Sequence, residues 1–170
     1  MKRAFLWVLV LAAGTVADPA SAFDSVDPAT AYAMATSNPK VFILDVRTPE
    51  EWLWVGHPGK NAAGEGAALD GKVVNISWEK EKKGALILNP SFLTDVAEAF
   101  ADDPSIVLLL MCRSGKRSAA AAAALEAAGY SVLNVATGFE GAVDSRGYRT
   151  VNGWKVLGLP YTYSGAAYPD

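Results

Sequence analysis

The chain's single cysteine lies in a short loop rich in cations. Cys112 opens the segment Cys-Arg-Ser-Gly-Lys-Arg-Ser, which ends at Ser118. An apolar run over 106–111 precedes it and an alanine run over 119–124 follows it, which predicts a buried strand, a loop and the start of a helix. Backbone N–H groups and cationic side chains around a thiol favour its ionised, reactive form. The segment therefore predicts sulfur or anion chemistry at Cys112.

The positive charge of this loop is local. Arg113, Lys116 and Arg117 lie in it, and residues 104–125 contain no carboxylate, whereas the net charge of the chain is −3. General affinity for nucleic acid or anionic membranes is therefore not implied. Gly115 allows the loop to curl and turn its N–H groups inward, so we expect it to hold the thiolate and an anionic substrate. The alternative is a structural, buried cysteine beside a solvated basic loop.

The first residues resemble an export signal. Lys2 and Arg3 precede an apolar run over 4–13, and an Ala-Ser-Ala sequence ends at Ala22. We expect residues 1–22 to be a signal peptide cleaved after Ala22, so that the protein is periplasmic or otherwise exported and has no membrane contact after cleavage. The alternative is an uncleaved anchor, but the apolar run is shorter than the ~20 residues that span a bilayer. In an oxidising compartment, one unpaired cysteine indicates a free reactive thiol or an intermolecular bond.

The remaining pattern predicts one α/β domain over 23–165, with a C-terminal tail over 166–170. Apolar runs predict strands that alternate with helices, which is typical of a mainly parallel sheet with helices on both faces. The predicted strands cover 41–46, 73–76, 106–111 and 131–135, and the predicted helices 28–37, 90–100 and 118–128. Sites in such sheets form at the carboxyl ends of strands. Asp45 and Arg47 end the first of these strands, so we expect them at the same edge as Cys112.

The sequence also predicts several local features of this α/β domain. We expect Asn89 and Pro90 to open a helix directly, and Ser118 to cap the alanine helix. Residues 56–71 are expected to form an irregular loop. We also expect a short helix around Trp154, and poor order from Tyr161 onward.

The motifs and the order in which they occur resemble those of the rhodanese-domain sulfurtransferases, including the active-site loop of that family. The resemblance covers about 27–160. It is carried by the Cys112 loop with its alanine helix and by five further pieces: Leu44-Asp45-Val46-Arg47 with Glu51-Trp52, Gly56-His57-Pro58-Gly59, Val74-Asn75-Ile76, Ala128-Gly129-Tyr130, and Val135 with Gly138. The chain departs from the family's pattern in the Gly-His turn, in a longer loop over 61–70 and in an insertion over 142–152. We expect these loops to reshape the mouth of the pocket.

The resemblance implies a rhodanese-like fold and a thiosulfate sulfurtransferase that works through a Cys112 persulfide. The donor would be a small anionic sulfur compound such as thiosulfate, and the acceptor a thiol or a protein. The resemblance implies that the donor is bound by the rest of the loop, namely Arg113, Ser114, Gly115, Lys116, Arg117 and Ser118. Asp45 and Arg47 would be supporting residues, ion-paired or bonded to the loop. No cofactor is implied.

Two other functions remain open beside this enzyme. The same persulfide chemistry could serve a carrier that accepts sulfur from one protein and passes it to another without turnover. A phosphatase or arsenate reductase would need five residues between its cysteine and arginine, whereas four separate Cys112 from Arg117. His57 is expected to be structural rather than a proton shuttle. One cysteine and one histidine do not build a metal site, so we expect none.

Overall fold

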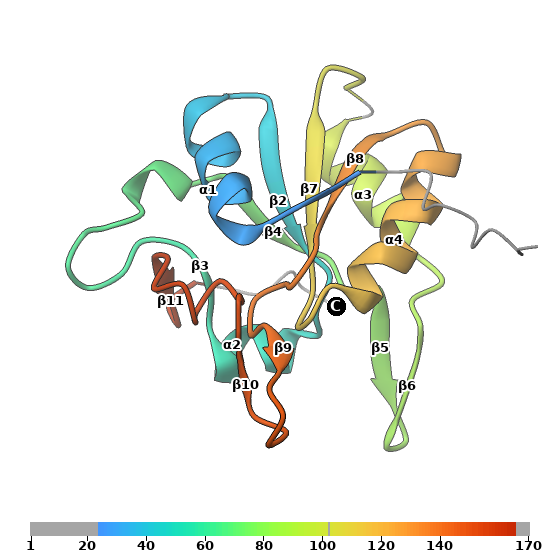
Figure 1. Cartoon of the computed structure of the whole chain (residues 1–170). Coiled ribbons are helices and arrows are strands. Elements are labelled where there is room, and N and C mark those ends of the chain that lie inside the picture. The colour runs from blue at the N-terminus through green and yellow to red at the C-terminus, as the bar shows by residue number, and fades with distance from the viewer. Residues whose placement is uncertain (1–23, 102, 166–170) are drawn as a thin grey trace, which may run out of the picture.

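The chain folds around a parallel sheet of five strands with helices on both faces (Figure 1). The computed structural model describes residues 24–101 and 103–165, so the predicted signal peptide and the 166–170 tail lie outside the described residues. The sheet has the order β1-β8-β7-β2-β4, and all its pairings are parallel. Its strands are β1 (Ser25–Val26), β8 (Ser131–Val135), β7 (Val107–Met111), β2 (Val41–Asp45) and β4 (Val73–Asn75). The predicted α/β class is confirmed.

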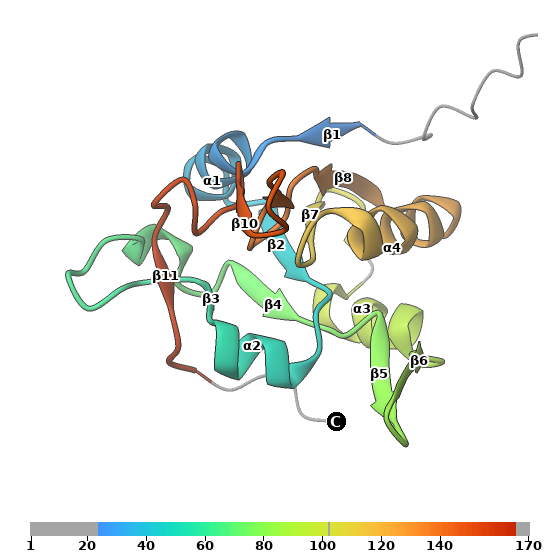
Figure 2. The same ribbon diagram turned by 60° about the horizontal axis from the view of Figure 1, so that its bottom comes forward.

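The central strand β7 is apolar because both faces of the sheet are covered. Leu108 and Leu110 pack into one core with helices α3 (Phe92–Phe100) and α4 (Lys116–Ala127). Leu109 and Met111 pack into a second core with helix α1 (Pro28–Ser37) and Trp154. Successive side chains of a strand point to opposite faces, so a continuous apolar run supplies both cores. Figure 2 shows the helices on the two sides of the sheet.

Two helices, α1 and α2, begin directly after a residue whose side chain caps the first turn. The Asp27 carboxylate accepts hydrogen bonds from the N–H groups of Ala29 and Thr30, so α1 starts at Pro28 as predicted. Helix α2 (Pro49–Val55) begins with a capping box in which Thr48 and Glu51 each bind the other's backbone N–H. Each such cap satisfies donors that a helix leaves without partners at its first turn.

Two other predicted helix starts are wrong. Helix α3 begins at Phe92, because Asn89 is used in a turn: its side-chain oxygen accepts from the Ser91 N–H and its amide donates to the Ser77 carbonyl. Helix α4 begins at Lys116, with Gly115 as its N-cap at φ 89° and no side-chain cap. Ser118 therefore lies inside the first turn, where it is buried and available for another contact.

The C-terminal segment is more ordered than predicted. Tyr161 and Thr162 form strand β11, which pairs antiparallel with β3 (His57–Pro58). Trp154 lies in consecutive turns instead of a helix, and its buried indole donates to the Pro160 carbonyl at 2.9 Å. The predicted loop over 56–71 contains β3 and the 3-10 helix η1 (Ala67–Leu69). These short elements depend on contacts between distant segments, which local patterns do not show.

Two hairpins that were not predicted extend from the sheet (Figure 1). They are formed by β5 (Glu79–Lys82) with β6 (Ala85–Leu88), and by β9 (Ala142–Val143) with β10 (Arg149–Val151). The first hairpin projects as an arm from the end of the sheet at which β7 leads into α4 (Figures 1 and 2). Within residues 24–101 and 103–165, no helix is long and apolar enough to cross a membrane.

Candidate active site

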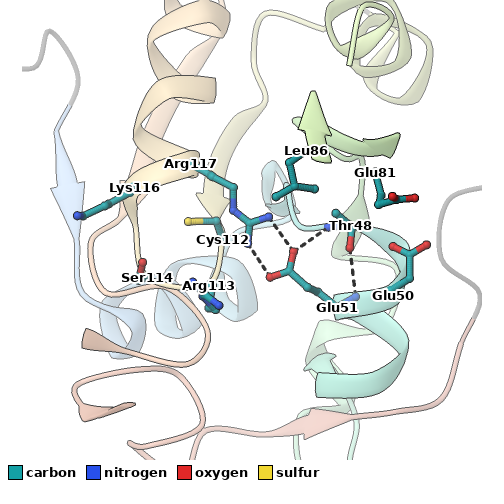
Figure 3. Close-up of a pocket in the computed structure, with 10 residues that line it drawn as sticks. All are labelled: Thr48, Glu50, Glu51, Glu81, Leu86, Cys112, Arg113, Ser114, Lys116 and Arg117. Atoms are coloured by element: carbon teal, nitrogen blue, oxygen red, sulfur yellow. Dashed lines mark hydrogen bonds and ion pairs between the residues drawn. The ribbon is translucent and has the colours of Figure 1, made fainter. Parts of the chain in front are cut away.

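The parallel sheet brings the predicted site residues to one edge. Cys112 directly follows β7, and Asp45 ends β2 in register with Met111. A cavity of about 660 Å³ opens onto Cys112 (Figure 3). Its lining comes from the cysteine loop, from α2 and from the first hairpin: Thr48, Glu50, Glu51, Glu81, Leu86, Cys112, Arg113, Ser114, Lys116 and Arg117. The site is thus built from segments that are far apart in the sequence.

Close backbone packing behind the loop holds Cys112 in place. The Phe139 N–H donates to the Cys112 carbonyl at 2.8 Å, and the Glu140 N–H donates to the Arg113 carbonyl at 2.9 Å. Gly138, at φ 61°, permits this approach, because an added Cβ would lie 2.8 Å from the carbonyl carbon of Arg113 and nearer still to the Cys112 carbonyl oxygen. With its carbonyls bound on this side, the loop can direct N–H groups toward the sulfur.

Among the described residues, two groups are placed to donate a hydrogen bond to the sulfur of Cys112. The Gly115 N–H donates to Sγ at 3.2 Å, and the Ser118 hydroxyl lies 3.4 Å from Sγ. The same hydroxyl lies 2.7 Å from Oδ1 of the buried Asn134. A hydroxyl has one hydrogen, so Ser118 can donate to only one of these acceptors at a time. Cys112 is a free cysteine with 1% of its surface exposed, so the cavity is the route by which a reactant reaches it.

Arg117 is paired with Glu51. Its Nη1 and Nη2 atoms donate to the two carboxylate oxygens at 2.7 and 2.6 Å. Burial opposes the charge of both groups, but their mutual hydrogen bonds and attraction outweigh it, so the pKa of Glu51 is lowered and that of Arg117 is raised. No carboxylate lies near Arg117 in the sequence, and its partner comes from a position 66 residues away. The pair therefore links the first turn of α4 to α2.

Arg113 and Lys116 remain available for an anion. Both side chains are exposed, and among the residues that the structure describes neither forms an ion pair or side-chain hydrogen bond. In Figure 3, Arg113 lies on the Cys112 side of the cavity and the Lys116 chain extends away from its centre. Ser114 is half-buried and also lines the cavity. These positions are compatible with the binding of an anionic donor beside the thiol.

Asp45 and Arg47 form a fully buried ion pair outside the cavity lining. Nη2 of Arg47 lies 2.5 Å from Asp45 Oδ2 and also donates to the Gly56 carbonyl at 2.9 Å. The guanidinium lies over the Phe139 ring, 4.2 Å from its centroid. Of the two expected arrangements, the ion pair is therefore the one present. It joins the end of β2 to the end of α2 and to the segment that holds Cys112.

His57 is a structural residue in this arrangement. Its ring stacks on Trp52 with centroids 3.6 Å apart, and its two nitrogens lie 3.0 Å from the carbonyls of Pro58 and Ser164. Burial lowers its pKa, although both carbonyls favour the charged form. It does not line the cavity, and the part of the chain that the structure describes contains no cluster of potential metal ligands.

Sequence reasoning missed several residues around the thiol. Glu51 appeared only as part of the family resemblance, and nothing local indicated that it binds an arginine 66 positions away. Asn134, a polar residue in a buried strand, was a detectable signal because such groups need a partner. The loops over 61–70 and 142–152 were expected to shape the cavity, but neither lines it; the first hairpin does, through Glu81 and Leu86.

Comparisons with known proteins agree with this architecture. An uncharacterized protein of Rickettsia conorii is 34% identical over 137 residues, which cover 78% of this chain and 92% of that protein. The crystal structure of Rv0390 from M. tuberculosis superposes with a TM-score of 0.67 at 32% identity, covering 83% of this chain and 98% of that one. A polysulfide-sulfur transferase homodimer from Wolinella succinogenes shares the fold, with a TM-score of 0.54 at 21% identity over 82% of this chain and 78% of its own.

The family match covers the elements that build the site. The Rhodanese-like domain family matches residues 27–145, from the cap of α1 through the cysteine loop and the segment packed behind it. The predicted recognition and rhodanese-like fold are confirmed by this match and by the superposed structures. The chain therefore belongs to the rhodanese-like domain family, a family of sulfur-transfer proteins.

Proposed function

We propose that this protein is an exported sulfurtransferase that moves sulfane sulfur from thiosulfate, or a similar anionic donor, to a thiol acceptor. The observation that carries the proposal is the placement of its one thiol. Cys112 lines an open cavity beside the Gly115 N–H, and two further lining residues, Arg113 and Lys116, have no ion-pair partner among the described residues. Such surroundings stabilise a thiolate and attract an anion.

The first half-reaction loads sulfur onto the enzyme. The Cys112 thiolate attacks the outer sulfur of thiosulfate, the S–S bond of the donor breaks, and sulfite leaves with its two negative charges. Arg113, with Lys116 at the rim, attracts the dianion. The loop N–H groups and the Ser118 hydroxyl donate hydrogen bonds that stabilise the negative charge of the new persulfide. No proton transfer is needed when the thiol is already ionised.

The second half-reaction returns the enzyme to its starting state. An acceptor thiolate attacks the outer sulfur of the persulfide, the Cys112 S–S bond breaks, and Cys112 leaves as a thiolate. The acceptor departs as a persulfide. Metal and cofactor have no step in this scheme, and the residues that bind the anionic donor serve both halves.

The decisive experiment is mass spectrometry of the protein after incubation with thiosulfate, following reductive pretreatment. We expect a mass gain of one sulfur atom in the wild type and none in Cys112→Ser. An unmodified wild type would refute the proposal. Purification from the exporting host also tests localisation, since N-terminal sequencing should find Phe23 as the first residue of the mature protein.

A sulfur carrier is a second candidate, supported by exposed apolar side chains on the hairpin that borders the cavity. Leu86 and Leu88 are 51% and 61% exposed, and Leu86 lines the cavity. Contiguous apolar surface beside a site is typical of protein docking. Steady-state turnover separates the two functions: an enzyme releases many sulfite molecules per protein with thiosulfate and a small thiol, whereas a carrier releases one and stops.

A further inference from the structure

The cavity in front of Cys112 has two walls of opposite charge. Arg113 and Lys116 belong to the cysteine loop, whereas Glu50 on α2 and Glu81 on β5 lie across Glu51 from the thiol (Figure 3). Within the described part of the chain, none of these four exposed side chains forms an ion pair, whereas Glu51 is paired with Arg117. The fields of both walls therefore reach a molecule in the cavity.

The pleat of the first hairpin makes its inner face acidic. Glu81 pairs directly with Leu86, and both line the cavity, so their shared face is the inner one. Side chains alternate along a strand, which places Glu79 on this face and Lys80 and Lys82 on the other. The inner face therefore presents the Glu81 carboxylate and the Leu86 side chain to the cavity, while the lysines of the same strand lie on the other face.

The charged lining and the volume of the cavity together indicate what kind of molecule binds in it. On the side of α2 and the hairpin, Glu50, Glu51 and Glu81 line the cavity and Arg117 neutralises only one of them, so a cation is favoured there. On the loop side, an anion is favoured beside Arg113. The cavity of about 660 Å³ is of the size that holds organic ligands, far more than a four-oxygen anion fills.

We infer that this cleft selects sulfur compounds that carry an ammonium group as well as an acidic group, namely free aminothiols of amino-acid or short-peptide size. The ammonium group lies toward Glu50 and Glu81, the carboxylate toward Arg113, and the aliphatic part against Leu86, which brings the sulfur to Cys112. The inference rests on the proposed function, because it assigns the thiol acceptor of the same site.

Mixed-disulfide formation tests this selection without requiring a persulfide. The Cys112 thiolate attacks a symmetrical disulfide, its S–S bond breaks, one half stays on Cys112 and the other leaves as a thiolate. The probes are cystamine, which carries only ammonium groups, cystine, which carries both charges, and dithiodipropionate, which carries only carboxylates. Cys112 is the chain's one cysteine, so the rate of labelling by mass spectrometry reports this site alone.

The informative quantity is the rate of the variant divided by that of the wild type for each probe, because this ratio cancels intrinsic disulfide reactivity. In Glu50→Gln/Glu81→Gln we expect labelling by cystamine and cystine to slow about five-fold, and labelling by dithiodipropionate to accelerate, since two exposed charges are removed. Glu98→Gln, an exposed glutamate of α3 outside the cavity, changes no ratio.

Equal ratios for all three probes would overturn the inference, whether the double variant slows them all or none. Arg113→Gln gives the reciprocal measurement: dithiodipropionate and cystine should slow and cystamine should not. The proposed function fails separately, through the absence of a thiosulfate-derived mass gain on Cys112. A charge-selective thiol that gains no sulfur would thus retain the inference and refute the sulfurtransferase.

Discussion

Replacing Gly138 by alanine tests whether the backbone packed behind the cysteine loop sets the position of the thiol. At φ 61° the new Cβ would lie 2.8 Å from both the Arg113 carbonyl carbon and the Ser114 nitrogen, below the 3.0 Å at which something must shift. All these atoms are backbone, so no flexible side chain can move aside. The loop must separate from the 138–140 segment, which weakens the hydrogen bond from Phe139 to the Cys112 carbonyl.

The magnitude has two parts. An alanine in the left-handed region costs about 1–2 kcal/mol wherever it is placed. Forcing atoms into a packed region adds about 1–3 kcal/mol. We therefore expect Gly138→Ala to lose about 2–5 kcal/mol of unfolding free energy, the sum of both parts. Displacement of a reacting group by a fraction of an ångström to 1 Å should also slow sulfur loading, by about 100-fold at the upper end.

Gly71→Ala is the matched control. Its φ of 71° is close to that of Gly138, but an added Cβ meets nothing within 4 Å. It should show the backbone cost of about 1–2 kcal/mol alone and load sulfur at the wild-type rate. Urea denaturation and single-turnover sulfite release measure the two effects. Wild-type sulfur loading in folded Gly138→Ala, or equal loss of stability in the two variants, would refute the reasoning.

Three further changes test the surroundings of the thiol. Ser118→Ala removes a donor to the sulfur and leaves Asn134 Oδ1 without that donor, so alkylation of the thiol at pH 7 should slow about five-fold and stability should fall by about 1–2 kcal/mol; unchanged alkylation would contradict the contact. In Glu51→Gln we expect the free energy of unfolding, measured by urea denaturation, to fall by about 2 kcal/mol. Because the pKa of Glu51 is lowered in the folded state, its ionised form stabilises the fold above pH 4.5, and the wild type loses this stability as the pH falls further; Glu51→Gln should not show that loss. His57 is the one histidine and its pKa is lowered from 6.5, so its neutral form stabilises the fold above pH 6.5 and this stability is lost as the pH falls. A thermal-unfolding series from pH 7.5 to 5.5 should show this decline in the wild type and a flatter profile in His57→Gln; equal slopes would assign the decline elsewhere.

Most of the framework was predictable because it depends on local patterns. The apolar runs over 41–46 and 106–111 identified β2 and β7. The cap residue Asp27, followed by Pro28, identified the start of α1. Helix α4 was found but its start was misplaced, because Gly115 occupies the cap at a positive φ and leaves Ser118 for a contact with Asn134. Serine is a common cap, so sequence alone favours the wrong role.

The predictions that failed concern contacts between distant segments. Strand β11 exists only by pairing with β3, and a strand of two residues has no pattern of its own. The first hairpin has alternating charges on one strand and apolar residues on the other, and nothing in this pattern indicated that it borders the cavity. The loops that looked unusual beside the family, 61–70 and 142–152, lie outside the cavity lining instead.

The sequence by itself determined the chemistry at the centre of the site. A lone cysteine between an apolar run and an alanine helix, with cations around it, specifies a thiol at the carboxyl end of a strand because parallel strands end at one edge. Only the tertiary structure decided which charges surround that thiol. Arg117 is neutralised by Glu51 while Arg113 is not, and Glu81 faces the cavity, because side-chain electrostatics depend on distances in space between residues that the chain holds far apart.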